Sequence, residues 1–416
     1  MELPSLSRNR VLAIFGFLVV LFILGFLLFW AFFRTDTAVN GNTNTTSNGR
    51  LPNTNDGVNR STTNTNSVSV LPITNTQIEV PSATADGGKT IAQSLVDTPS
   101  ANIALAGNGV DLIYYEELSG KFYQLDRNGV ERKVLNDTTF KGVSDVAWSP
   151  NRQRAVLTFK DGANIVYDFS KQQQISLPTE LQEFSFSPDS AQIAAKFIGP
   201  TKDDNWLAVV DVNGGNVQVV EPLRDKENQV QVNWSPNSQI VATYQQSIDS
   251  ERQEIVPLGI QGENFKSFEV EGRGFEGKWD QSGNRLLYSV YSSSSSMNPE
   301  LYIVQARGDA IGESNTRLNL QTWPDKCAFT SSATKVYCAV PQGLESGSGL
   351  YPELANSVPY QFYEINLSTG VQQLIATPTN TTGETRYSVG NVYLSGAEDQ
   401  IYFTDQDGKI RTIKLR

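Results

Sequence analysis

The chain has 416 residues, enough for two or three ordinary domains or for one large all-β domain with extensions. A formal net charge of −11, without any run of basic residues, excludes the basic surface that a nucleic-acid partner requires. Histidine is absent, which excludes Ser-His-Asp and Cys-His catalytic pairs and histidine-based zinc sites. Carboxylate, tyrosine, lysine and Ser-Lys chemistry stay open. We expect no bound cofactor.

The first predicted element is a membrane-spanning helix over Val11 to Phe33, which are apolar without interruption. A helix of this length rises roughly 35 Å, enough to cross a hydrocarbon core of about 30 Å. No cleavage site follows the run, which argues against a signal peptide. Arg8 and Arg10 precede it, whereas only Arg34 follows it directly. The positive-inside rule therefore places the short tail 1–10 in the cytoplasm and everything after the helix outside, as a single-pass protein of the cell membrane.

Residues 34–98 are predicted to be a disordered tether. The segment is rich in Asn, Thr and Ser and has too little apolar surface to offset its chain entropy. Its last part, from Leu71 to Val96, contains some alternation of apolar and polar residues. That alternation leaves open an additional strand that packs on the domain that follows.

The remaining residues, 99–416, contain seven similar units. Each unit has an apolar anchor, a short polar turn and an apolar strand that begins about seven residues later. Successive anchors lie 43, 38, 48, 45, 50 and 65 residues apart, close to the roughly 40–50 residues of a four-stranded propeller blade. We therefore predict an all-β fold, a seven-bladed β-propeller of four-stranded antiparallel blades, with six blades as the alternative. The anchors are Leu105, Trp148, Phe186, Trp234, Trp279, Phe329 and Leu394.

The turns after three anchors carry a family resemblance. They read WSPN at 148–151, FSPD at 186–189 and WSPN at 234–237. They resemble the WD40-like (PD40) repeats of the TolB type, in which an aromatic residue and a Ser-Pro-Asp-Gly turn precede a β-branched strand. The resemblance covers roughly 100–416 and implies the propeller fold. TolB itself has six blades beside a separate domain, so the resemblance does not imply its partners.

The last unit ends at Arg416 after three strands, whereas the first unit has four. A ring closes when the chain ends pair, which removes exposed strand edges. We therefore predict that a strand from just before residue 101 completes the last blade.

The two cysteines, Cys327 and Cys338, flank the turn of the sixth unit. A hairpin centred between Ser332 and Ala333 places them directly opposite each other on one face of the sheet, close to disulfide distance. In an oxidising extracytoplasmic compartment such a pair is expected to form a disulfide. A slip of one residue would separate them and leave two small buried thiols, which is the alternative.

Two further motifs are not interpreted as sites. Turns of the type Asp-x-Asn/Asp-Gly at 126–129, 211–214 and 405–408 lack the remaining ligands of a calcium loop and are predicted to be β-turns. We therefore expect no metal site. Gly272 to Gly277 matches GxGxxG but precedes a strand instead of a helix, so we predict a loop between two blades and no nucleotide site.

The predicted binding surface is one face of the propeller. Loops between the second and third strands of a blade share this face with the connections between blades, and here they are long, up to 341–359. Long loops on a rigid scaffold are where binding residues concentrate. For two of the candidates, Phe275 and Trp323, packing between blades is the alternative. The candidate contact residues are Trp206, Arg252, Arg273, Phe275, Trp323, Asp325, Lys326, Leu350 and Tyr351.

The favoured function is a membrane-anchored, non-enzymatic scaffold that binds a protein or a polymer of the cell envelope. It depends on fold-level analogy and on the missing histidine. The alternative is a propeller enzyme that acts on glycans or lactones through carboxylates or a bound cation, with Glu276, Asp325 or Glu353 as its acids. A third possibility is a transmembrane signal transducer, which would need a partner because its cytoplasmic tail has only ten residues.

Overall fold

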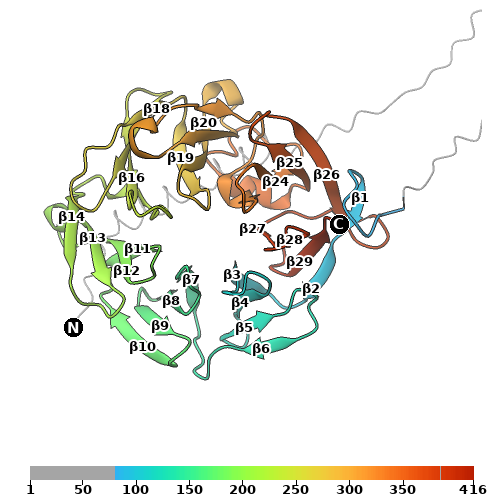
Figure 1. Cartoon of the computed structure of the whole chain (residues 1–416), viewed down its shortest axis with the longest axis horizontal. Coiled ribbons are helices and arrows are strands. Elements are labelled where there is room, and N and C mark those ends of the chain that lie inside the picture. Colours follow the sequence, from blue (N-terminus) through green and yellow to red (C-terminus); the bar gives the residue numbers. More distant parts are fainter. Residues whose placement is uncertain (1–79, 385) are drawn as a thin grey trace, which may run out of the picture. The chain divides into compact units, whose positions relative to one another are not determined.

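A computed structural model describes residues 80–384 and 386–416. In these residues seven β-sheets surround a central axis, and each contains the four antiparallel strands of one propeller blade (Figure 1). The predicted all-β fold with seven blades is confirmed, and the six-bladed alternative is wrong. The predicted membrane helix at 11–33 and the tether before residue 80 lie outside the described residues. Within the described residues no helix is long and apolar enough to cross a membrane.

In blades 1 to 5 the strands follow one another outward from the axis in chain order (Figure 1). Blade 1 consists of β3 (Ser100–Leu105), β4 (Leu112–Glu116), β5 (Lys121–Leu125) and β6 (Arg132–Val134). Blade 2 consists of β7 (Val143–Trp148), β8 (Arg154–Phe159), β9 (Asn164–Asp168) and β10 (Gln173–Leu177). Blade 3 consists of β11 (Leu181–Phe186), β12 (Gln192–Phe197), β13 (Trp206–Asp211) and β14 (Gln218–Pro222). Blade 4 consists of β15 (Val230–Val232), β16 (Ala242–Ser247), β17 (Gln253–Leu258) and β18 (Phe268–Val270).

The last three blades complete the ring. Blade 5 consists of β19 (Arg273–Trp279), β20 (Arg285–Tyr291), β21 (Pro299–Gln305) and β22 (Thr316–Arg317). Blade 6 consists of β23 (Cys327–Phe329), β24 (Lys335–Pro341), β25 (Tyr360–Asn366) and β26 (Gln372–Thr379), with β1 (Lys89–Ile91) as a fifth strand. Blade 7 consists of β27 (Val392–Leu394), β28 (Gln400–Thr404), β29 (Ile410–Lys414) and β2 (Gln93–Val96). Short 3-10 helices lie in the connections; those used below are η5 (Pro324–Lys326) and η6 (Pro352–Ser357).

The turn after each anchor explains why the repeat is visible in the sequence. In blade 2 the Ser149 hydroxyl is buried and accepts a hydrogen bond from the backbone N–H of Arg154 at 3.0 Å. A side-chain oxygen closes the same turn in five other blades, including those without the Ser-Pro pair. The oxygens belong to Ser187, Ser235, Asp280, Thr330 and Ser395. Blade 1 has Ala106 at this position, and there the Asn108 side-chain oxygen accepts hydrogen bonds from the backbone N–H groups of Val110 and Asp111 instead.

The ring closes through the segment before residue 101, as predicted. Strand β2 pairs antiparallel with β29, with Gln93 opposite Thr412 and Val96 opposite Ile410. Strand β1 adds to blade 6 instead, parallel to β26. Both strands lie within 34–98, the range predicted to be a disordered tether. They lie in its last part, where the alternation of apolar and polar residues allowed an additional strand.

Candidate functional site

Two adjoining cavities of about 230 and 290 Å³ lie between the inner strands of blades 4 to 7. We call them together the axial site. They share Glu276 and Asp325, so one pair of carboxylates faces both. The first cavity is also lined by Gln231, Gly277, Lys278, Pro324, Asn391, Val392 and Tyr393. The second is also lined by Trp323, Lys326, Pro352, Glu353, Asn356 and Tyr360.

Blade 5 supplies its site residues through strand alternation. Phe275 and Trp279 point into the core between blades, so Glu276 and Lys278 face the opposite side. The pairing of β19 with β20 shifts register between Arg273 and Glu276, and Gly274 has φ 64° within this bulge. A bulge of this kind re-aims the side chains that follow it.

Blade 6 supplies the remaining groups. Pro324 occupies the first turn of η5, where its missing N–H costs nothing, and the helix presents Asp325 and Lys326. The long loop between β24 and β25 contains η6, which carries Glu353. Tyr360 is the first residue of β25. The second cavity therefore lies on the face of the propeller that was predicted to bind.

Glu276 is an unpaired carboxylate. Its side chain is open to water in the cavities, yet protein surrounds it, and the structure gives it no hydrogen bond or ion pair within residues 80–384 and 386–416. Loss of bulk water raises the pKa of Glu276, and the negative charge of Asp325 raises it further, while Lys326 lowers it. Glu353 is exposed and likewise has no side-chain partner in that range.

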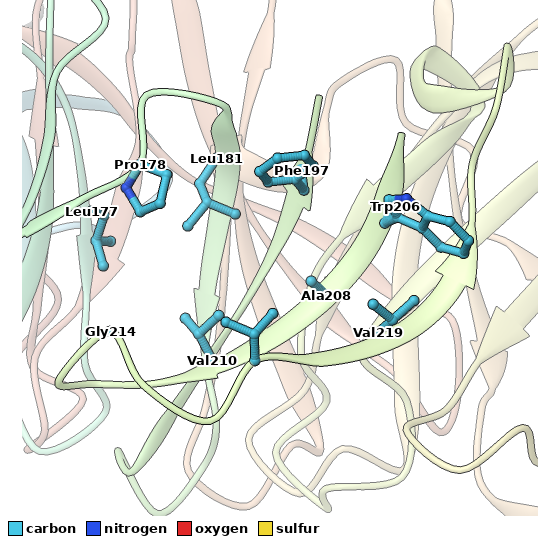
Figure 2. Close-up of a pocket in the computed structure, with 10 residues that line it drawn as sticks. Leu177, Pro178, Leu181, Phe197, Trp206, Ala208, Val210, Gly214 and Val219 are labelled. Atoms are coloured by element: carbon cyan, nitrogen blue, oxygen red, sulfur yellow. The ribbon is translucent and has the colours of Figure 1, made fainter. Parts of the chain in front are cut away.

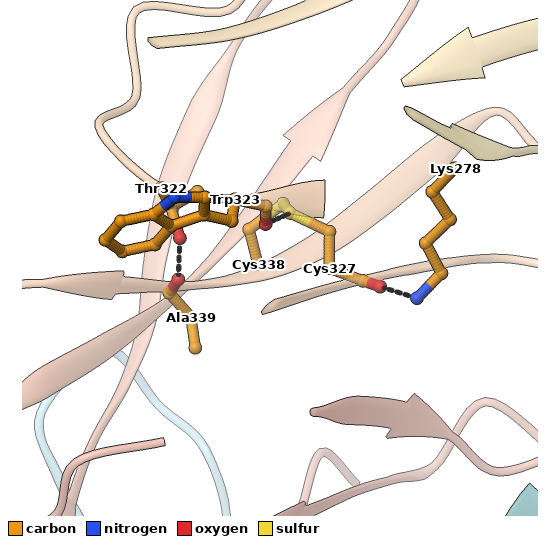
Figure 3. Close-up of a disulfide and its surroundings, with 6 residues drawn as sticks. All are labelled: Lys278, Thr322, Trp323, Cys327, Cys338 and Ala339. Atoms are coloured by element: carbon orange, nitrogen blue, oxygen red, sulfur yellow. Dashed lines mark hydrogen bonds between the residues drawn. A yellow bond between two sulfur atoms is a disulfide. The ribbon is translucent and has the colours of Figure 1, made fainter. Parts of the chain in front are cut away.

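The lysines of the site are already engaged. Lys326 Nζ lies 2.8 Å from Asp325 Oδ2. Lys278 Nζ donates a hydrogen bond of 2.6 Å to the carbonyl oxygen of Cys327 (Figure 3). Burial lowers the pKa of Lys278 to about 8. Neither ammonium is left over to neutralise Glu276.

Two aromatic residues of the second cavity carry unpaired polar atoms. Tyr360 is 3% exposed and Trp323 is 5% exposed. No hydrogen bond is present for the phenol O–H of Tyr360 or the indole N–H of Trp323 in the described part of the chain, and both side chains line the cavity. Neither atom is sealed off in the way that Trp234 Nε1 is. Burial, with a smaller contribution from the charge of Asp325, raises the pKa of Tyr360.

The disulfide lies directly beneath this site. Cys327 and Cys338 are opposite partners in the β23–β24 register, their Cα atoms are 4.1 Å apart, and the sulfurs are bonded. Cys327 is the residue that ends η5, and Figure 3 shows it between Trp323 and Lys278. The cross-link thus holds the start of β23, directly after η5, which presents Asp325 and Lys326.

The structure brings together only part of the predicted contact residues. Trp323, Asp325 and Lys326 meet in the second cavity, beside Glu276 and Glu353. Arg252 lines a separate cavity of about 450 Å³ that is also lined by Glu269 and Arg317.

Four other predicted residues lie apart from the axial site. Leu350 and Tyr351 are exposed on the loop before η6. Arg273 donates a hydrogen bond to the carbonyl oxygen of Asp249. Phe275 is 2% exposed and its ring centroid lies 5.1 Å from that of Tyr288. It therefore packs in the core, which was the alternative to a contact residue.

The glycine motif at 272–277 was predicted to be a loop between blades. Instead, Arg273 to Gly277 belong to β19. The reason is that the bulge at Gly274 accommodates the glycine-rich stretch inside the strand.

Trp206 lies elsewhere, in an apolar groove of about 270 Å³ between blades 2 and 3 (Figure 2). We call this the rim groove. Leu177 and Pro178 from the end of blade 2 face Phe197 and Val219 of blade 3 across it. Its remaining lining residues are Leu181, Ala208, Val210, Gly214 and Val217.

Several residues of the axial site were missed by the sequence analysis, namely Gln231, Lys278, Asn356, Tyr360, Asn391 and Tyr393. A signal was present for two of them. Lys278 and Tyr393 each directly precede an anchor, Trp279 and Leu394, on an inner strand. Alternation turns that position away from the blade core when the anchor points into it. Tyr360 had no such signal, because its place at the mouth depends on the fold of a long loop.

Comparison with known proteins supports the β-propeller fold. No family model matches the sequence, and no curated protein is significantly similar to it. The β-propeller domain of Cps50 (Swd1) from Myceliophteria thermophila is 13% identical with a TM-score of 0.53, over 78% of this chain and all of that one. Hydrazine synthase from Kuenenia stuttgartiensis is 12% identical with a TM-score of 0.51, over 76% of this chain and 96% of that one.

A third similar structure is an oligogalacturonate lyase in complex with manganese, 12% identical with a TM-score of 0.49, over 78% of this chain and 93% of that one. What the comparisons share with this chain is the β-propeller fold. Identities this low show the fold alone.

The raised pKa of Glu276 predicts how stability responds to its removal. A pKa higher in the folded than in the unfolded chain means that folding takes up protons, so the charged form at neutral pH opposes folding. Glu276→Gln should therefore leave the melting temperature unchanged or raise it. Differential scanning calorimetry of the full chain at pH 7 measures this.

Asp280→Asn is the matched control. The Asp280 carboxylate is 1% exposed, closes its turn and pairs with Arg285 at 3.3 Å, so its neutralisation should lower the melting temperature. If Glu276→Gln lowers it as much, then Glu276 has a structural role and the site assignment fails.

Proposed function

We propose that this protein is a membrane-anchored, extracytoplasmic β-propeller that acts as a non-enzymatic binding scaffold for a protein or an envelope polymer. We further propose that the ligand is contacted at the axial site. One observation carries the proposal. Two buried aromatic residues with unpaired donors, Tyr360 and Trp323, line the same cavity as Glu276 and Glu353, whose carboxylates are unpaired among the described residues.

The physical argument starts from the cost of unpaired polar groups. Buried polar side chains are almost always hydrogen-bonded, and leaving one without a partner costs about 1–3 kcal/mol. The donors of Tyr360 and Trp323 are not sealed off, so they avoid the full cost, and a ligand in the cavity supplies the acceptors that the fold does not. Groups that the fold leaves unpaired in one cavity are therefore best explained by a partner from outside the chain. The position on the face with long loops supports the same conclusion.

The membrane attachment and the compartment are supported by two features. The unbroken apolar run from Val11 to Phe33 is long enough to span a bilayer, and its flanking arginines favour an orientation with the propeller outside. The Cys327–Cys338 disulfide is of a type that persists in oxidising compartments.

A second candidate, a carboxylate-dependent enzyme acting on glycans or lactones, is favoured by one observation. Glu276 has a raised pKa and lines the same cavity as Asp325, and paired carboxylates serve as acid and base in glycoside hydrolysis. The two proposals differ in what Glu276→Gln does. A scaffold loses affinity only, whereas an enzyme retains bound substrate and loses its conversion.

Site-directed photo-crosslinking in intact cells tests the scaffold proposal. A photoreactive amino acid replaces Tyr351, which is 57% exposed on the loop before η6, and the cross-linked product is quantified. The double variant Glu276→Gln, Glu353→Gln should reduce the yield about tenfold, as expected when charge-assisted contacts are lost.

The double variant Glu131→Gln, Glu313→Gln is the matched control. It removes the same charge from exposed positions between the third and fourth strands of blades 1 and 5, on the opposite face, and should keep the yield. Equal yields in both double variants would contradict the proposal. A photoreactive residue at Val219 in the rim groove tests the competing surface, and cross-linking there alone would assign the contact to that groove.

A further inference from the structure

The second cavity of the axial site has an excess of negative charge. Three carboxylates line it, those of Glu276, Asp325 and Glu353, against a single lysine, Lys326, which already pairs with Asp325. Lys278 in the neighbouring cavity is committed to the Cys327 carbonyl oxygen. Among residues 80–384 and 386–416, Glu276 and Glu353 thus have no cation paired with them, and protein around Glu276 weakens the screening by water.

A cation is the group that these carboxylates require. The two causes that raise the pKa of Glu276, loss of water and the nearby charge of Asp325, both act against its negative charge. A positive group placed between Glu276 and Glu353 would offset both causes, since an opposite charge favours the ionised carboxylate. A chain with a net charge of −11 also attracts basic partners at long range.

The neutral hydrogen-bond donors of the cavity indicate which groups the ligand carries besides its positive charge. The Tyr360 O–H and the Trp323 N–H need acceptors, which an ammonium or guanidinium group does not have. A peptide supplies both at once, because backbone carbonyl oxygens lie next to a basic side chain. An amino sugar also combines a cation with oxygen acceptors. Sugar rings, however, stack on open aromatic faces, and Tyr360 and Trp323 are only 3% and 5% exposed, too little for such stacking.

We propose that the axial site binds a protein partner through an arginine or lysine side chain that enters between Glu276 and Glu353. The adjacent backbone carbonyl oxygens of that partner accept hydrogen bonds from Tyr360 and Trp323. Arginine suits the position better, since its guanidinium pairs with two carboxylate oxygens at once. This inference depends on the proposed scaffold function and narrows its ligand to a basic peptide segment.

The test uses the full chain in lipid nanodiscs, labelled with ¹⁵N at tryptophan, and three probes. The probes are acetyl-Gly-Arg-Gly-amide, the same peptide with neutral citrulline in place of arginine, and a glucosamine trimer. The indole N–H resonance of Trp323, assigned with Trp323→Phe, reports binding. We expect a saturable shift with the arginine peptide that weakens as salt is added, and an affinity for the citrulline peptide about tenfold lower.

Variants locate the binding. Glu276→Gln combined with Glu353→Gln should weaken the arginine peptide about tenfold, whereas Glu131→Gln combined with Glu313→Gln should change it by less than about twofold. If the citrulline peptide binds with equal affinity, the requirement for a positively charged ligand is overturned. Cross-linking at Tyr351 would in that case still support the scaffold function. If the glucosamine trimer binds and the arginine peptide does not, the proposal of a protein partner is overturned and an amino-sugar polymer is the ligand. An unshifted Trp323 resonance at millimolar arginine peptide would overturn the inference altogether.

Discussion

A chain that begins at Pro99 is expected to lose most of the stability that a chain beginning at Val80 retains. The longer chain contains β2, which closes the ring, and β1, which adds a fifth strand to blade 6. Without β2, blade 7 has three strands and the β29 edge is left unpaired. The melting temperature should fall by more than about 10 °C, if the unfolding transition stays cooperative at all.

The size of the effect follows from what the two strands bury. Val96 is 8% exposed in a cluster with Leu112, Tyr402 and Ile410, and Ala92 is 4% exposed in the cluster between blades 6 and 7. Burying one valine side chain contributes about 1.5–3 kcal/mol, and each backbone hydrogen bond adds about 1 kcal/mol. The sum approaches the roughly 5–15 kcal/mol that stabilises a whole domain.

Thermal unfolding followed by circular dichroism measures the difference between the two chains. Val96→Asp in the full chain is a milder version, since it places a charge in the same cluster and leaves the backbone pairing intact. If the chains beginning at Val80 and Pro99 melt at the same temperature, β2 is not what closes the ring.

Removal of the disulfide is expected to have the second largest effect. Cys327 and Cys338 are both fully buried, and they close a loop with a sequence separation of 11. Loop-closure entropy for a loop of this size predicts a loss of about 3 kcal/mol for the double variant Cys327→Ala, Cys338→Ala. The variant should also bind the ligand of the axial site less well, because Cys327 directly follows η5 and its carbonyl oxygen accepts the hydrogen bond from Lys278.

Denaturant unfolding with and without a thiol reductant measures this loss. Reductant should lower the stability of the wild-type chain toward that of the double variant and leave the variant itself unchanged. A wild-type chain whose thiols are free by mass spectrometry but whose stability is unchanged would show that strand pairing alone holds β23. If the variant binds the ligand of the axial site more weakly even at temperatures far below its melting point, the disulfide positions the site in addition to stabilising the fold.

The sequence predicted most of the features that depend on neighbours along the chain, although not that Arg273 to Gly277 belong to a strand. An anchor and its turn are stabilised within one hairpin, as when Ser149 closes its turn onto Arg154, so seven blades could be counted from local patterns. The opposition of Cys327 and Cys338 is equally local, because a hairpin centre determines which residues face each other. The missing outer strand of blade 7 was inferred because an antiparallel ring must pair its ends.

The tertiary structure alone decided where these local units place their side chains relative to one another. Glu276 comes from blade 5, whereas Glu353 and Tyr360 come from a long loop and a strand of blade 6, and only the closed ring brings them to one cavity. The addition of β1 to blade 6 and the rim groove around Trp206 are likewise contacts between blades. Strand periodicity specifies which face of a strand is buried, but contacts between distant blades depend on ring geometry and loop conformation, which no local pattern encodes.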